Sequence, residues 1–204
     1  MLTSIFFVFQ ACAPQSAESA SDDTASTADA GASFVPYAED GESVERLEPD
    51  RYLGLWYEIA TTPSQQQASC SGTTAEYALL EDETIGVTNR CYFGSLDGNL
   101  NEIEATARPL DETFARLMVD FGFGFEAPYT VVDLVDPGDG TPYLYAVVSS
   151  IGTQAWVLSR TPQMPEDVYE SLLARIDERG GDSSELLPTE QPQPSEDAQD
   201  PTED

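Results

Sequence analysis

The chain holds few of the side chains with which proteins catalyse reactions or bind metals. Its 204 residues include no histidine, so the commonest general base and the commonest zinc ligand are both absent. Without histidine, neither a Ser–His–Asp nor a Cys–His nucleophile can form, and acid–base chemistry would rest on carboxylates, tyrosine or arginine. Gly122-x-Gly124 lies between two apolar segments with no helix after it, which argues against a phosphate-binding loop. These features favour a binding protein over an enzyme and predict no metal and no cofactor.

The chain is strongly acidic. Asp and Glu together number 38, against 8 basic residues that are all arginine, and the formal charge is −30 at pH 7. A surface of this sign repels the phosphates of nucleic acids, so we exclude a nucleic-acid partner. We interpret the charge as a contribution to solubility or salt tolerance, because net charge bears on solubility and association rather than on fold.

The N-terminus carries a pattern typical of export. Residues 2–9 form an apolar run that is far too short to span a bilayer as a helix, and Gln10-Ala11-Cys12 follow it. This arrangement resembles the lipobox of bacterial lipoproteins, in which the cysteine becomes the acylated first residue. The resemblance implies a lipoprotein-type signal peptide over 1–11 and a Cys12 that carries acyl chains such as palmitate and anchors the protein to a membrane. The alternative is an ordinary secretory signal with an incidental cysteine, which would leave a secreted or periplasmic protein.

Two acidic segments flank the part of the chain that we expect to fold. Ser, Ala, Thr, Asp and Glu dominate 12–45, and Asp, Glu, Gln and Pro dominate 190–204. Both segments have too few large apolar residues to offset the entropy lost on ordering. We therefore predict a disordered acidic tether over 12–45, one folded domain over 46–189, and a disordered acidic tail over 190–204.

The expected domain is a succession of short segments in which apolar and polar residues alternate. Turn-forming Gly, Pro, Asp or Asn residues separate the segments, and no helical pattern comes between them. Such spacing is typical of an antiparallel barrel or sandwich made of sequential hairpins. The predicted strands are 53–60, 73–80, 84–93, 100–108, 113–121, 127–135, 143–150 and 154–160. After them, Pro165 begins a segment with apolar residues at helical spacing and Gly180-Gly181 ends it, which predicts one amphipathic helix.

Alternation within the strands predicts which side chains face the interior. In 113–121, Leu117, Val119 and Phe121 share one face, which we expect to line the interior. The small residues Ala105 and Ala107 share the inward face of 100–108. They leave room for a cavity or for large side chains from the opposite wall.

Three sequence motifs indicate which kind of barrel this is. Residues 54–56 read Gly-Leu-Trp at the start of the first strand, Tyr129 to Asp133 lie within the sixth, and 156–162 read Trp-Val-Leu-Ser-Arg-Thr-Pro at the end of the last. In this order, with a helix after them, the motifs resemble those of the lipocalin family over about 47–189. The bacterial outer-membrane lipoprotein lipocalins, which are apolipoprotein D-like, are the nearest form. The resemblance implies an all-β fold, an eight-stranded antiparallel up-and-down β-barrel with one C-terminal α-helix packed outside.

The same resemblance implies a function. It implies that this chain binds and stores or transports a small hydrophobic ligand at the bacterial cell envelope. The implied ligand is a fatty acid, a lysophospholipid or a similar lipid. The expected partners are that ligand and, through the lipid anchor, the outer membrane. One alternative is a lipocalin-fold enzyme that acts on a lipophilic substrate. Another is a surface protein in which the acidic tails are the working part.

The resemblance also assigns roles to single residues. It implies that Arg160 packs its guanidinium over the Trp56 indole and seals one end of the barrel, a structural contact that contributes about 0.5–2 kcal/mol. From there, alternation turns Glu58 and Ala60 inward on the first strand and Trp156 inward on the last. An inward Glu58 needs a polar partner unless a bulge turns it outward, and both remain open. The predicted ligand-binding residues are Tyr77, Leu117, Val119, Phe121, Tyr129, Val131, Tyr145 and Trp156, with Leu79 and Leu158 as further interior candidates.

Cys70 and Cys91 fall on neighbouring predicted strands. A turn centred near 82–83 would place Cys91 opposite about Thr74, four residues from Cys70, so the register alone does not provide a cross-strand bond. An exported protein can keep a disulfide, and the family resemblance implies a Cys70–Cys91 bridge. The alternative is two free thiols.

Overall fold

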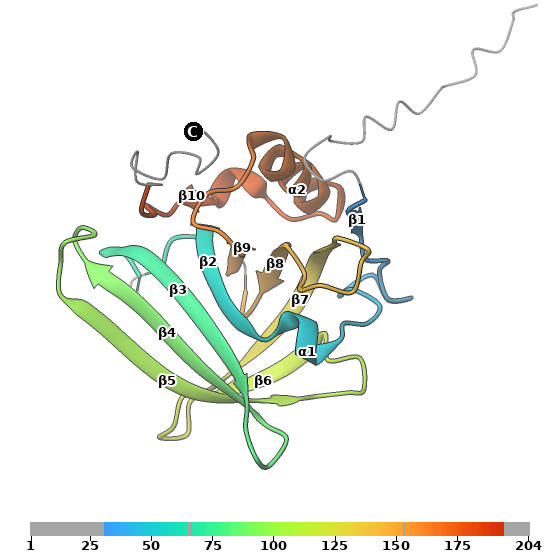
Figure 1. The fold of residues 1–204 in the computed structure, drawn as a ribbon, viewed down its shortest axis with the longest axis horizontal. Helices are drawn as coiled ribbons and strands as arrows, with labels where there is room; N and C mark the ends of the chain where they lie inside the picture. The colour runs from blue at the N-terminus through green and yellow to red at the C-terminus, as the bar shows by residue number, and fades with distance from the viewer. Residues whose placement is uncertain (1–30, 65–66, 153, 194–204) are drawn as a thin grey trace, which may run out of the picture.

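The computed structural model describes residues 31–64, 67–152 and 154–193. Eight strands form a closed antiparallel barrel in which each strand pairs with the next along the chain and β9 pairs back with β2 (Figure 1). Their bounds are β2 Gly54–Thr61, β3 Cys70–Leu79, β4 Ile85–Phe93, β5 Leu100–Pro109, β6 Arg116–Asp120, β7 Glu126–Asp136, β8 Tyr145–Ser149 and β9 Ala155–Ser159. The predicted eight-stranded up-and-down barrel is confirmed, and every strand begins and ends within three residues of its predicted position.

Bulges in two strands decide which side chains face the interior. The pairing of β2 with β9 shifts between Glu58 and Ala60, and the pairing of β7 with β8 shifts between Val131 and Asp133. A bulge adds one residue to one strand and interrupts the alternation of its faces. Glu58 and Val131 therefore face inward, whereas Ala60 and Asp133 face the helix outside the barrel. The prediction of an inward Ala60 is wrong for this reason.

One end of the barrel is packed solid. A short helix, α1 (Pro49–Tyr52), precedes β2 and lies across this end (Figure 1). Trp56, Leu134 and Ala146 are fully buried in the interior cluster, and Leu47 from the segment before α1 joins them. Burying a large apolar side chain contributes about 1.5–3 kcal/mol, so this cluster is a main source of the barrel's stability.

The predicted C-terminal helix is confirmed as α2 (Glu166–Glu178), which lies against the outside of the barrel (Figure 1). It begins after Pro165 and has two acids in its first turn, which suits the positive end of the helix dipole. Val168 and Leu172 are its buried residues, and they pack on Val147 and Val157 of the barrel. No helix within the described ranges is long and apolar enough to cross a membrane.

An ion pair beneath α2 joins the helix to the barrel. Arg175 donates to the fully buried Asp133 carboxylate, with 2.7 Å between Nη2 and Oδ1. The Tyr37 hydroxyl donates to the same carboxylate at 3.0 Å. The guanidinium also lies 3.8 Å from the centre of the Phe34 ring. Because Phe34 and Tyr37 precede the barrel in the chain, this pair fastens the N-terminal segment as well as the helix.

The folded unit extends beyond the predicted limits of 46 and 189 at both ends. Residues 31–45, expected to be part of a disordered tether, include β1 (Ser33–Phe34), which pairs with β7, and the fully buried Val44. After α2 come a 3-10 turn, η1 (Ser183–Glu185), and β10 (Leu187–Pro188), which pairs with β2. Beyond 189, the buried Gln191 donates hydrogen bonds to the backbone carbonyls of Glu58 and Thr73. The rest of the tether and tail, the predicted signal peptide over 1–11 and Cys12 lie outside the described residues.

The disulfide between Cys70 and Cys91 is confirmed, with 5.4 Å between the two Cα atoms. The pairing of β3 with β4 places Cys70 opposite Phe93 and shifts between Ser71 and Thr74. This irregularity absorbs part of the offset that the simple register predicts. The bridge therefore ties the start of β3 to the end of β4 beside the interior.

Candidate ligand-binding cavity

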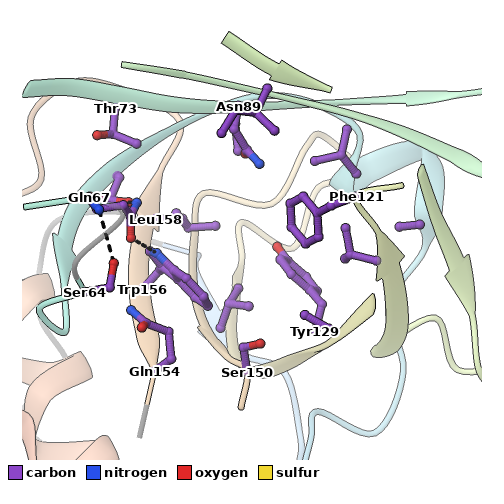
Figure 2. Close-up of a pocket in the computed structure, with 18 of the residues that line it drawn as sticks. Ser64, Gln67, Thr73, Asn89, Phe121, Tyr129, Ser150, Gln154, Trp156 and Leu158 are labelled. Carbon is purple, nitrogen blue, oxygen red and sulfur yellow. Dashed lines mark hydrogen bonds between the residues drawn. The ribbon is translucent and has the colours of Figure 1, made fainter. Parts of the chain in front are cut away.

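The other end of the barrel is hollow. The cavity has a volume of about 550 Å³, within the 300–1,000 Å³ typical of small-molecule sites. Most of its wall is apolar or aromatic, and Figure 2 shows Trp156 and Tyr129 extending into it from different strands. Its lining residues include Glu58, Gln67, Tyr77, Asn89, Phe121, Tyr129 and Trp156.

Six of the eight predicted ligand-binding residues line this cavity. They are Tyr77, Leu117, Val119, Phe121, Tyr129 and Trp156, and the further candidate Leu158 lines it too. Val131 is fully buried in the packed interior cluster and is not among the lining residues. The inward face of β6 therefore forms part of the wall, as the alternation of 113–121 predicts.

Tyr145 and Leu79 do not face the cavity, which corrects their predicted interior placement. Ala146 and Val148 take the inward positions of β8, so alternation puts Tyr145 on the outer face, in the cluster beneath α2. Leu79 ends β3 near the turn to β4 and is 53% exposed. The sequence pattern identified both as strand residues but assigned them to the wrong face.

The sealed end of the barrel is built on Arg160. Its guanidinium carbon lies 3.8 Å from the centre of the Trp56 ring, which confirms the predicted stack. The guanidinium donates four hydrogen bonds, all to backbone carbonyls, those of Arg51, Tyr52, Leu55 and Tyr143. Burial lowers the pKa of Arg160 to about 10, so the group keeps its charge at neutral pH.

Three tyrosine hydroxyls meet at the floor of the cavity. The Tyr129 Oη lies 2.6 Å from the Tyr52 Oη and 2.9 Å from the Tyr77 Oη. Burial raises the pKa of Tyr77 to about 12 and raises the pKa of Tyr52 and Tyr129 well above the ordinary value. All three phenols are therefore neutral hydrogen-bond donors at physiological pH.

Glu58 faces the cavity and has polar partners, which answers the question that the sequence leaves open. Its side chain is buried, and its two oxygens accept hydrogen bonds from Gln67 Nε2 at 2.9 Å and Thr189 Oγ1 at 2.6 Å. The Gln67 amide oxygen in turn accepts a hydrogen bond from the Trp156 indole at 3.3 Å (Figure 2). Gln191 donates to the Glu58 backbone carbonyl. Glu58 thus joins the loop after β2 and the C-terminal segment to the cavity wall.

We expect the stability of the protein to depend on pH through Glu58. Burial raises the pKa of its carboxyl, and the hydrogen bonds from Thr189 and Gln67 oppose that effect only in part. The folded state therefore holds this proton more tightly than the unfolded chain, so the stability it contributes is present below the ordinary pKa of about 4.3 and is lost as pH rises through the raised value. The difference in unfolding free energy between wild type and Glu58→Gln should accordingly fall as the pH rises.

Urea unfolding at several pH values between about 4 and 7 measures this difference. Glu104→Gln is the matched control, because Glu104 is an exposed glutamate on the outer face of β5. A wild-type minus Glu58→Gln difference that stays constant with pH would contradict the prediction.

Some residues of the site were not predicted from the sequence. Gln67 lies in the loop after β2, and Thr189 and Gln191 lie more than a hundred residues further along the chain. Asn89 breaks the apolar run on the inward face of β4. An asparagine between the inward Val87 and Cys91 was a usable signal, whereas nothing in the pattern connects the C-terminal segment with Glu58.

Exposed aromatic and aliphatic side chains lie on two loops at the mouth. The loop between β6 and β7 carries Phe123, which is fully exposed, and Phe125, which is 59% exposed and also lines the cavity. Ile151, in the loop between β8 and β9, is exposed to the same extent and lines the cavity as well. On the side of these two loops, the entrance is therefore apolar on the outside as well as within.

A closed barrel that is sealed at one end and hollow at the other belongs to the class of barrel proteins that bind small hydrophobic molecules. Residues 47–191 match the model of the lipocalin-like domain. This chain belongs to the lipocalin family.

Known relatives agree with this assignment. The chain is 37% identical over 153 residues to the putative lipocalin R877 of Acanthamoeba polyphaga mimivirus, covering 71% of this chain and 85% of that protein. It is 34% identical over 155 residues to the outer membrane lipoprotein Blc of Vibrio cholerae, covering 75% and 88%. Among solved structures, lobster apocrustacyanin A1 superposes with a TM-score of 0.52 at 17% identity, covering 71% and 79%. The predicted family is thus confirmed, and that structure supports the fold.

Proposed function

We propose that the barrel binds and stores or transports one small lipid, such as a fatty acid or a lysophospholipid, at the bacterial cell envelope. The observation that carries the proposal is the mostly apolar cavity of about 550 Å³ inside the barrel. Burial of an alkyl chain there contributes about 0.8 kcal/mol for each methylene group removed from water. Binding without catalysis is the simpler role, because both oxygens of Glu58, the one acid among the described lining residues, already accept hydrogen bonds.

The envelope location is part of the proposal. Cys12 follows a short apolar run at the N-terminus, and an acyl anchor there would hold the barrel at a membrane. The relative from Vibrio cholerae is called an outer membrane lipoprotein. The exposed Phe123 beside the mouth suits exchange of a lipid with an apolar surface. A secreted or periplasmic form without the anchor is the alternative.

Filling the cavity tests the proposal. Asn89 projects into it from the middle of β4 (Figure 2), so Asn89→Trp should occupy the space of the ligand. We expect the affinity for the neutral fluorescent probe N-phenyl-1-naphthylamine to fall by at least about tenfold. Affinity falls by that factor when the probe buries less apolar surface by the amount of about two methylene groups. Fluorescence titration, with fatty acid and lysophospholipid as competitors, measures it.

Thr88→Trp is the matched control, because Thr88 neighbours Asn89 on β4 and is not among the lining residues. The control should bind the probe as wild type does. Failure of wild type to bind any probe saturably, or equal binding by Asn89→Trp and wild type, would overturn the proposal.

A further inference from the structure

The floor of the cavity offers a hydrogen that no described protein atom accepts. Two hydrogen bonds join the hydroxyls of Tyr52, Tyr129 and Tyr77, with Tyr129 in the middle. Each phenol has one hydrogen to donate, so two of the three hydrogens are used within this tyrosine trio and the third is left over. In the described ranges, the trio's hydroxyls make no other hydrogen bond.

The leftover hydrogen can be directed into the cavity. A chain of three hydroxyls has three possible arrangements of donors, and the free hydrogen belongs to Tyr129, Tyr77 or Tyr52 in turn. Tyr77 and Tyr129 line the cavity, whereas Tyr52 lies behind them. An acceptor atom on a ligand would select one of the two arrangements in which a cavity-lining tyrosine donates. A buried donor without an acceptor is costly, so such an acceptor is favoured.

A positive charge lies behind the trio. The Arg160 guanidinium donates only to backbone carbonyls, and no carboxylate of the described residues forms an ion pair with it. Its charge acts on the trio, because it lowers the pKa of Tyr77 and Tyr52 against the effect of burial. An uncompensated cation in a region of low dielectric constant attracts electron-rich atoms. The floor therefore favours an oxygen with partial or full negative charge.

The opposite charge lies nearer the mouth. Glu58 follows Trp56 by two positions along β2, away from the sealed end, and it is the one acid among the described residues of the wall. Its carboxylate is held by Gln67, which belongs to the loop after β2. A ligand carboxylate placed beside it would meet a like charge. Arg90 also lines the wall, but its guanidinium forms ion pairs with Glu76 and Glu102. The cavity is thus polarised along its length, with donors and a cation without a carboxylate partner at the floor and an acid above.

We propose that a single-chain lipid binds with its polar end at the floor of the cavity. A carbonyl oxygen of its carboxylate or ester then accepts a hydrogen bond from Tyr77 or Tyr129. The alkyl chain then extends past Trp156 and Phe121 toward the mouth. This orientation rests on the proposed function, and it makes the tyrosine trio the determinant of specificity for the polar end of the ligand.

Two dansyl probes with alkyl chains of equal length test the orientation in wild type. One is a fatty acid with the dansyl group at its ω end, and the other carries the dansyl group as an amide on the carboxyl carbon. With the polar end at the floor, the ω-labelled acid keeps its bulky group at the mouth, and we expect it to bind at least about tenfold more tightly. Equal binding of the two probes, or tighter binding of the carboxyl-labelled probe, would overturn the proposed orientation.

Removing the central hydroxyl tests the role of the trio. We expect Tyr129→Phe to weaken the ω-labelled acid by about three- to tenfold, the effect of one net hydrogen bond, with little change for N-phenyl-1-naphthylamine. Tyr143→Phe is the control, because it removes a buried hydroxyl that contacts Glu48 away from the cavity. If Tyr129→Phe fails to bind the neutral probe, Tyr77→Phe takes its place.

The outcomes separate this inference from the proposed function. Failure of wild type to bind N-phenyl-1-naphthylamine would overturn the proposed function itself. If the protein binds that probe and Tyr129→Phe binds the ω-labelled acid as tightly as wild type does, the proposed function stands. The proposed role of the tyrosine trio is then overturned. Competition by hexadecanoate and its methyl ester then distinguishes the two sources of the carbonyl, since the charge of Arg160 favours the carboxylate.

Discussion

Replacement of Arg160 by methionine is expected to lower the free energy of unfolding by about 3–4 kcal/mol. The substitution removes the stack on Trp56. It also removes four hydrogen bonds to backbone carbonyls, which join segments that are far apart in the chain. Hydrogen bonds to charged groups contribute about 1.5–3 kcal/mol each, but contributions within one cluster do not add fully. Methionine retains much of the aliphatic volume, so the loss reports the guanidinium rather than a cavity.

Urea unfolding followed by tryptophan fluorescence measures this effect. Arg108→Met is the matched control, since Arg108 is an exposed residue of β5 whose ion-pair partner, Glu126, lies 3.6 Å away. The control should cost less than about 1 kcal/mol. A similar small loss for Arg160→Met would mean that the sealed end does not depend on this residue.

Asp133→Asn is expected to lower the free energy of unfolding by about 3 kcal/mol. The carboxylate is fully buried, and it accepts hydrogen bonds from Arg175 and Tyr37. Removing one partner of a buried ion pair leaves the other charge uncompensated, which typically costs about 3–5 kcal/mol, and the partial exposure of Arg175 places the effect at the lower end. The substitution preserves shape, so the change isolates the charge.

We expect the loss of stability in Asp133→Asn to appear first as local unfolding and only then as unfolding of the whole domain. Hydrogen exchange should show faster opening of α2 and of β1, because Arg175 contacts both the barrel and Phe34. Glu126→Gln, which removes the exposed partner of Arg108, should leave these amides unchanged. Unchanged protection of α2 in Asp133→Asn would contradict a fastening role for the pair.

Much of the cavity was predictable from the sequence because strand alternation is a local property. Leu117, Val119 and Phe121 lie on one face for any regular strand, and they line the cavity as expected. Trp56 and Arg160 carried a second kind of information, the motif spacing that identifies the family. Predictions were wrong where alternation was extended along a strand from one assigned residue to the next. Ala60 lies beyond a bulge in β2, and in β8 Ala146 faces inward instead of Tyr145.

The sequence by itself determined the class of fold, the strand and helix positions, the family and the sealed end. These follow from periodicity, turn residues and motifs, which neighbouring residues express without tertiary context. Only the tertiary structure decided the partners of Glu58, the tyrosine trio and the placement of 31–45 and 190–193 against the barrel. These features depend on contacts between residues far apart in the chain, and on bulges whose positions are set by packing. Hydrogen-bond partners across such separations leave no periodic trace in a single sequence.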